Sequence, residues 1–112
     1  MKLVLPEPPS INRYWRNFRG RMVISADGRA YKLRVWAENR GQRPLEGPLS
    51  VSIRWYRGRR SGDLDNRAKV TLDALQGVAY EDDKQIVELH MWRHDDKNDP
   101  RVEVVICPAD AA

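Results

Sequence analysis

Apolar and polar residues alternate regularly along the middle of the chain. Leu49, Val51, Ile53 and Trp55 are separated by Ser50, Ser52, Arg54 and Tyr56. This period of two predicts a half-buried strand. Weaker versions of the pattern predict strands at residues 2–5, 21–25, 85–92 and 102–106. The polar segment 95–100 is then expected to be the hairpin connection between the last two strands.

Two segments have the spacing of amphipathic helices. The first begins at Ser25 or Asp27, either of which can cap it, and ends near residue 40 before a glycine and a proline. The second extends from about residue 65 to residue 75 and stops at Gly77. The side chains expected to face the core are Tyr31, Leu33, Val35 and Trp36 in the first helix and Ala68, Leu72 and Leu75 in the second.

A chain of 112 residues forms one domain, residues 1–112, in which residues 108–112 are expected to be a flexible tail. The elements predict an α/β (α+β-like) fold with a mixed sheet of about four to five strands and two main helices. Cys107 is the only cysteine, which excludes an intrachain disulfide and fits the reducing cytoplasm. No apolar segment approaches the roughly 20 residues of a membrane span, so no membrane contact is expected.

Charge indicates the class of partner. The chain has 20 Lys and Arg against 16 Asp and Glu, a formal net charge of +4, which favours a polyanion such as DNA. Positive charge concentrates in an expected loop at residues 10–16 and in the loop 57–60, although the second can also be a simple solvated loop. The candidate DNA contacts are Asn12, Arg13, Tyr14, Trp15, Arg16, Arg57, Arg59, Arg60 and Lys69.

Two acidic groups interrupt this basic background. Asp63 and Asp65 stand at the start of the second helix, Lys69 follows one turn later, and Asp82 and Asp83 come after the glycine that ends the helix. Carboxylate oxygens are the ligands that Mg²⁺ prefers. Crowded carboxylates repel one another unless a cation neutralises them. The pattern therefore predicts a divalent metal site.

The two acidic groups must meet to form such a site. A helix from Asp65 to Leu75 advances roughly 15 Å, and the following segment to Asp83 can span up to about 26 Å. Either Asp82 or Asp83 can therefore return to the Asp63 end of the helix. The ammonium group of the nearby lysine would stabilise negative charge during metal-assisted hydrolysis of a phosphodiester.

Simpler interpretations exist for each residue. An Asp-x-Asp sequence is often a loop or a helix cap, and Lys69 can form a surface ion pair with Asp65 or Asp73. The other simple interpretations are a turn for Asp82 and Asp83, solvated positions for His90 and His94, and packing for Trp92. The joint spacing of acid pair, lysine, helix, glycine and second acid pair favours the metal site over these interpretations.

The motifs together carry a family resemblance. They are Asp63-Leu64-Asp65-Asn66, Lys69, Leu72-Asp73-Ala74-Leu75, Gly77 and Tyr80-Glu81-Asp82-Asp83-x-Gln85-Ile86, with further similar segments at residues 8–15, 28–31 and 100–104. This set strongly resembles the RusA-type Holliday junction resolvases, a family of crossover junction endodeoxyribonucleases. The resemblance implies a small α/β fold, a homodimer, and Mg²⁺-dependent cleavage of four-way DNA junctions by symmetric nicks, with Mn²⁺ as a substitute.

The resemblance also assigns roles. Asp63, Asp65 and Asp83 match the metal-binding carboxylates of the family, with Asp82 as the alternative third ligand, and Lys69 matches its catalytic lysine. The positions with a supporting role are Asn66, Asp73 and Gln85. The implied setting is DNA recombination and repair at the nucleoid in the cytoplasm, with a phage or prophage as a common source. No small-molecule organic cofactor is expected.

Two other classes of function compete with this interpretation. A non-catalytic junction-binding or architectural protein would use the basic surface and keep the carboxylates for structure. Another metal-dependent phosphotransfer or sugar-nucleotide enzyme would use Asp-x-Asp to hold Mg²⁺, but the chain has no glycine-rich nucleotide-binding loop of the Walker type. The intact set of three aspartates and one lysine favours the endonuclease.

Overall fold

A computed structural model describes residues 1–109 and has a four-stranded mixed sheet at its centre. The strands are β1 (Lys2–Pro6), β4 (Leu49–Arg57), β5 (Ile86–Asp95) and β6 (Arg101–Pro108). Their order is β1-β6-β4-β5, so β4 lies inside the sheet, antiparallel to β6 and parallel to β5. Strand β1 pairs antiparallel with β6 at one edge.

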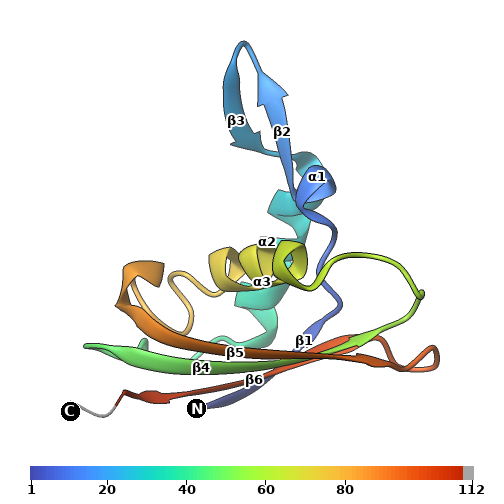
Figure 1. Ribbon diagram of the computed structural model, residues 1–112. Helices are drawn as coiled ribbons and strands as arrows, with labels where there is room; N and C mark the ends of the chain where they lie inside the picture. Colours follow the sequence, from blue (N-terminus) through green and yellow to red (C-terminus); the bar gives the residue numbers. More distant parts are fainter. Residues whose placement is uncertain (110–112) are drawn as a thin grey trace.

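The helices lie on one face of this sheet, as Figure 1 shows. The main helices are α2 (Ala26–Glu38) and α3 (Leu64–Ala74), and the smaller elements are helix α1 (Ile11–Tyr14), strands β2 (Trp15–Phe18) and β3 (Arg21–Ile24), and a 3-10 turn at Asp83–Gln85. Strands β2 and β3 form a separate two-stranded ribbon, which projects beyond the helices on the side away from the sheet (Figure 1). The predicted mixed sheet and two main helices are confirmed.

The inward-facing apolar side chains of β4 form the centre of the core. Its four inward side chains, Leu49, Val51, Ile53 and Trp55, have 0% exposure. Burial of each one contributes about 2 kcal/mol to the hydrophobic stabilisation. These side chains are buried because β4 lies between β5 and β6 in the sheet and the helices cover the face to which they point.

Helix α2 has a narrower apolar face than its sequence predicts. Tyr31 and Val35, one turn apart, are buried. Leu33 and Trp36 are 64% and 50% exposed, so their predicted place in the core is wrong. A helix that rests on one side of a sheet buries a single stripe, and these two side chains lie outside it.

The parallel pairing of β4 with β5 requires a crossover connection, and α3 supplies it. The chain leaves β4 at Arg57, passes along α3 and enters β5 at Ile86, which pairs with Leu49 at the start of β4. The expected hairpin between β5 and β6 is therefore wrong, since β4 lies between them. The physical reason is that β4 has the longest apolar alternation and takes the position where both of its edges are paired.

The loop expected after the amino-terminal prolines is a helical turn followed by a strand. The carbonyl oxygen of Ser10 accepts hydrogen bonds from the amides of Arg13 and Tyr14, at 3.1 and 2.9 Å, which closes the single turn of α1. Strand β2 then pairs with β3 across Arg19 and Gly20, whose φ angles are 51° and 78°. Positive φ at both positions is typical of the type I′ turn that suits a two-stranded ribbon.

Tyr14 and Ser25 join the two ends of this ribbon. The Ser25 amide donates to the Tyr14 carbonyl oxygen at 2.8 Å, and the Ser25 hydroxyl accepts from the Gly28 amide at 3.0 Å as the predicted cap of α2. The buried Tyr14 side chain donates its hydroxyl to Asp73 of α3 at 2.5 Å. The ribbon is therefore anchored to both main helices.

The sheet includes more of the carboxyl terminus than the sequence suggests. Pro108 belongs to β6 and pairs with Leu49, and the Ala109 amide donates to the Pro48 carbonyl oxygen at 3.0 Å. The predicted flexible tail is therefore wrong at residues 108 and 109, while residues 110–112 lie outside the described part of the chain. Within residues 1–109, no helix is long and apolar enough to cross a membrane.

We expect Gly28→Ala to destabilise the protein. A β-carbon there would collide with the Tyr14 carbonyl oxygen and lie 2.8 Å from Ile24 Cγ2, so the root of the ribbon must shift, at a cost of about 1–3 kcal/mol. Urea unfolding followed by circular dichroism measures the loss. Ala37→Gly, at an exposed position of the same helix, is the control and costs about 1 kcal/mol through helix propensity. A Gly28→Ala variant as stable as the parent would contradict the close contact.

Candidate functional site

The first acidic group lies where the loop after β4 meets α3. Asp63 is the cap residue, with φ and ψ of -88° and 145°, but its side chain makes no capping hydrogen bond. Asp65 is in the first turn, and both side chains are exposed. The partial positive charge at the start of a helix stabilises such carboxylates. Their oxygens stay available to a ligand.

Lys69 is exposed one turn further along α3. Its predicted alternative partner, Asp73, is engaged elsewhere: the Asp73 carboxylate pairs with Lys32 Nζ at 3.6 Å and accepts hydrogen bonds from Tyr14 and Gln76. In the part of the chain that the structure describes, Lys69 forms no ion pair. Its ammonium group is therefore free for an anionic partner.

The second acidic group lies at the opposite end of α3. The Asp83 amide donates to the Gln76 side-chain oxygen at 3.3 Å, and the Gln76 side-chain nitrogen donates to Asp73 at 3.1 Å. Asp83 is therefore grouped with Asp73, at the end of the helix, while Asp63 caps its start. The 11 residues of α3 hold the two groups about 16 Å apart along the helix axis.

The course of the chain between α3 and β5 explains this separation. The Gly77 amide donates to the Tyr80 carbonyl oxygen at 2.7 Å, and the Tyr80 hydroxyl donates to the Leu72 carbonyl oxygen at 2.5 Å. The segment folds back on the end of the helix and does not extend along it. The expected meeting of Asp83 with Asp63 in one chain is therefore wrong. Within residues 1–109, no three His, Cys, Asp or Glu side chains form a group that could hold a metal ion.

Asp82 and Asp83 differ in how far they are engaged. The Asp82 carboxylate accepts from the Lys84 amide at 2.9 Å and caps the 3-10 turn, and the Gln85 side-chain oxygen accepts from the Asp82 amide at 3.1 Å. The Gln85 nitrogen also donates to two backbone carbonyls of the loop before β4, at 2.9 and 3.1 Å. Gln85 is therefore a structural support, and the Asp83 carboxylate is the freer of the two acids.

Neighbouring acids perturb Asp83. Although it remains largely exposed, partial desolvation, then the Asp82 carboxylate and the charge on Asp73, raise the pKa of its carboxyl group. Desolvation, followed by the charges on Asp83 and Asp73, also raises the pKa of Tyr80. A cation among these acids would relieve the repulsion. Negative charge is therefore concentrated at this end of α3.

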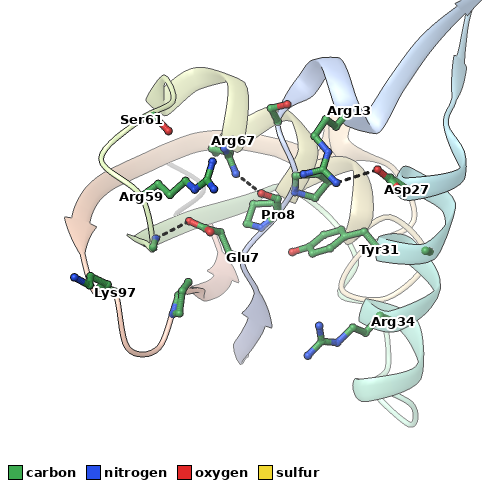
Figure 2. Close-up of a pocket in the computed structure, with 15 residues that line it drawn as sticks. Glu7, Pro8, Arg13, Asp27, Tyr31, Arg34, Arg59, Ser61, Arg67 and Lys97 are labelled. Atoms are coloured by element: carbon green, nitrogen blue, oxygen red, sulfur yellow. Dashed lines mark hydrogen bonds and ion pairs between the residues drawn. The ribbon is translucent and has the colours of Figure 1, made fainter.

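A cleft of about 860 Å³ lies beside the loop that leads to Asp63, because Arg59 and Ser61 of that loop line it. Figure 2 shows side chains from α1, α2 and the loops around β1 and β4 facing this space. Its positively charged residues are Arg13, Arg34, Arg59, Arg67 and Lys97, and its acidic residues are Glu7 and Asp27. The net positive lining suits an anion such as a DNA phosphate.

Several residues of this cleft lie outside the motifs of the sequence. The Arg67 guanidinium group lies over the Trp55 ring, 5.0 Å from its centroid, and donates to the Pro8 carbonyl oxygen. Its Nε has no partner within residues 1–109, and burial lowers its pKa. The Glu7 carboxylate accepts from the Trp55 indole at 2.9 Å. Arg67 lies inside the acidic motif, between Asp65 and Lys69, and this position in the sequence could have indicated it as a site residue. Glu7 and Lys97 are distant from the motif in the sequence, and only the fold brings them to the cleft.

The expected DNA contacts divide into exposed and engaged side chains. The exposed ones are Asn12, Arg13, Arg16, Arg59, Arg60 and Lys69, of which Arg13 pairs with Asp27 at 3.0 Å and Arg60 with Asp95 at 3.7 Å. Asn66 of the supporting set is partly exposed. Tyr14 is fully buried, and the Arg57 side chain is 12% exposed and bound to Asp95. This burial excludes Tyr14 and Arg57 as direct contacts. Trp15 is partly buried against the core and packs edge-on against Tyr14, with centroids 4.5 Å apart.

The face of the sheet opposite the helices carries the remaining aromatic and histidine candidates. Trp92 is 42% exposed, with the Arg54 guanidinium group 4.4 Å from its ring centroid. His94 hydrogen-bonds Arg54 at 3.2 Å, and His90 contacts Glu88 at 3.2 Å. Helix α3, which lies between the two acidic groups, is on the other face (Figure 1). These residues are therefore separate from the candidate site.

Comparison with known proteins gives an independent finding. The family model described as Endodeoxyribonuclease RusA matches residues 6–107. A crossover junction endodeoxyribonuclease of Enterobacteria phage 82 is 37% identical over 109 residues, which cover 93% of this chain and 91% of the relative. A protein of the same name from Shigella sonnei (strain Ss046) is 36% identical over 109 residues, with the same coverage. The matched region includes both acidic groups and the lysine between them.

Without metal, we expect Asp83→Asn to raise the unfolding temperature at neutral pH. Its raised pKa means that the folded chain binds this proton more tightly than the unfolded chain, so ionisation above the folded-state pKa opposes folding. The gain should vanish below the unfolded-state pKa of about 4. Thermal unfolding in EDTA across this pH range measures it. Glu81→Gln, at an exposed neighbour, is the control, and an equal gain there would contradict a specific repulsion at Asp83.

Proposed function

Because the chain belongs to the RusA endodeoxyribonuclease family and is a nuclease, we propose that it resolves four-way DNA junctions by Mg²⁺-dependent hydrolysis, with paired symmetric nicks. The observation that carries this proposal is the family match over residues 6–107, which includes Asp63, Asp65, Lys69 and Asp83. Relatives at 36% and 37% identity are crossover junction endodeoxyribonucleases. The exposed arginines support binding to a phosphate backbone.

Asp63, Asp65 and Asp83 are the metal ligands in this proposal. Their oxygens suit Mg²⁺, or Mn²⁺ as a substitute, and the raised pKa of Asp83 marks a carboxylate whose charge a cation would offset. When bound, Mg²⁺ supplies a polarised phosphoryl oxygen and a water of lowered pKa. The Lys69 ammonium group, exposed on α3, stabilises negative charge that develops on the scissile phosphate.

The functional unit in this proposal is a homodimer. A four-way junction has two equivalent scissile strands, and a twofold axis presents one site to each. The separation of Asp63 from Asp83 by α3 adds a second reason, because within residues 1–109 one chain assembles no group of three ligands. A second copy could bring its own Asp83 to the Asp63 and Asp65 of the first.

The proposed setting is DNA recombination and repair in a bacterial cytoplasm. A phage origin for one of the relatives supports a phage or prophage context. The single cysteine, Cys107, is a free thiol on the exposed part of β6. A free exposed thiol is compatible with a reducing compartment.

We expect the purified protein to nick a synthetic four-way junction symmetrically in Mg²⁺ and to leave it intact in EDTA. Asp65→Asn should lower the cleavage rate at least a hundredfold, because it removes one charged ligand, while the Kd for the junction in EDTA changes less than about threefold. Denaturing electrophoresis of end-labelled strands measures the nicks.

The control for this variant is Glu81→Gln, which removes an exposed carboxylate next to the second acidic group. Linear duplex and forked DNA at the same salt concentration test the selectivity for junctions. No cleavage by the parent with any divalent metal would reject the enzyme. Equal loss of binding and cleavage in Asp65→Asn would reject the metal role of this residue.

Mixing two inactive variants tests how the carboxylates are shared between chains. If one site uses Asp65 of one chain and Asp83 of the other, a heterodimer of Asp65→Asn with Asp83→Asn contains one intact site and one doubly altered site. We therefore expect the mixture, after exchange of subunits, to recover nicking of one strand per junction. Each variant alone stays inactive. No recovery by exchanged heterodimers, verified by differently tagged chains, would mean that each site belongs to a single chain.

A further inference from the structure

The ribbon formed by β2 and β3, residues 15–24, is an exposed basic arm. It contains Arg16, Arg19 and Arg21 and no acidic residue, and residues 16–22 are all exposed. Within residues 1–109, these three arginines form no ion pair. The arm projects away from the body on the helical side of the molecule (Figure 1). Its charge is therefore uncompensated and available to a polyanion.

The aromatic ring of Phe18 lies among these arginines. Phe18 is 47% exposed, although it is large and apolar. The guanidinium carbons of Arg16 and Arg19 are each 5.3 Å from its ring centroid, and Arg21 is its direct partner across the ribbon. Residues paired across a ribbon share a face, so one face of the arm presents an aromatic ring among three guanidinium groups.

We propose that this face binds the branch point of the DNA junction, where Phe18 stacks on an exposed base pair and the arginines hold the flanking phosphates. The inference rests on the proposed function and names how the substrate is selected. Aromatic rings stack on nucleic-acid bases of any sequence. Ribbons and apolar wedges enter DNA at base steps that can be unstacked.

The branch point differs from a duplex in the surface that Phe18 can reach. In a continuous duplex each base pair is covered by its neighbours, so insertion costs a few kcal/mol of stacking. At the centre of an opened four-way junction the terminal base pairs of the arms lack one neighbour, and a ring can stack there without that cost. Phe18 therefore contributes to the preference for junctions, whereas the arginines contribute to binding of any DNA.

The root of the arm fixes its direction relative to the rest of the site. The Ser25 amide bonds to the Tyr14 carbonyl oxygen at 2.8 Å, and the Arg29 guanidinium group donates to the Ile24 carbonyl oxygen at 2.9 Å. The Tyr14 hydroxyl reaches Asp73 of α3. The arm is thus tied to the helix that also carries Asp65 and Lys69. DNA held by the arm is presented to the same side of the sheet as these residues.

Equilibrium binding in EDTA tests the inference without any need for cleavage. The probes are a synthetic four-way junction and a linear duplex of the same sequence, measured by fluorescence anisotropy at one salt concentration. Phe18→Ala should raise the junction Kd about tenfold and leave the duplex Kd within about twofold, the loss expected for one stacked base. Phe18→Trp should keep the junction preference, since it preserves the stacking surface.

Two further variants separate the ring from the charge. Met22→Ala is the matched control, because Met22 is 67% exposed on the same arm but pairs with Asn17, on the ribbon face opposite Phe18. It should change neither Kd. Arg21→Ala should raise both Kd values and reduce the slope of log Kd against log salt by about one. Thermal unfolding confirms that each variant folds.

The outcomes are distinct. A parent that prefers the junction, together with a Phe18→Ala variant that keeps this preference, overturns the role of the arm and leaves the proposed function standing. A parent with no preference for the junction overturns both. If Phe18→Ala instead changes the oligomeric state in light scattering and weakens binding to both DNAs equally, the ring contacts a second copy of the chain and the inference is wrong.

Discussion

Parallel pairing between β4 and β5 constrains the positions of all the residues that we connect with cleavage. Two parallel neighbours begin at the same end of a sheet, so the connection between them must cross back over its length. Helix α3 makes this crossing. Asp63 follows the end of β4, and Asp83 precedes the start of β5, so the two acidic groups lie at opposite ends of the crossover. Their distance in space is a consequence of sheet topology and not of their own chemistry.

Asp73 connects the acidic end of α3 with the arm. Its carboxylate accepts from the Tyr14 hydroxyl at 2.5 Å and lies 3.6 Å from Lys32 Nζ, while its charge contributes to the raised pKa of Asp83. Tyr14 in turn precedes the first residue of the arm. Asp73 therefore contacts the root of the arm and also contributes negative charge near Asp83. The motif suggested only a supporting role for Asp73, and these contacts show that the residue holds the root of the arm against α3.

The pattern of apolar and polar residues predicted those helices and strands whose buried side chains recur at a regular spacing. Strand β4 is the clearest case, because every second residue is apolar and buried. Strand β2 has no such pattern, since Arg16 and Asn17 interrupt it, and its pairing depends on the turn at Arg19 and Gly20. The order of the strands depends on contacts between distant segments, which no local period encodes. In the same way the motif predicted the acidic residues, but the fold of the segment between Gly77 and Tyr80 decides where Asp83 lies.

The helical side of the molecule carries positive charge that no acid of the described chain compensates. On the open face of the sheet, Arg101 is bound to Asp96 and Glu103, and Arg57 at the end of β4 is bound to Asp95. On the helical side, the arginines of the arm and Lys69 form no ion pair in the described chain. A net charge of +4 is small for a DNA-binding domain, so these uncompensated groups near α3 and on the arm matter more than the total charge. Since electrostatic steering follows the uncompensated charge, DNA is guided toward the side that carries Asp63 and Asp65. In the proposed function, the acids repel the same backbone until a cation binds them, so metal and DNA would favour each other's binding at this face.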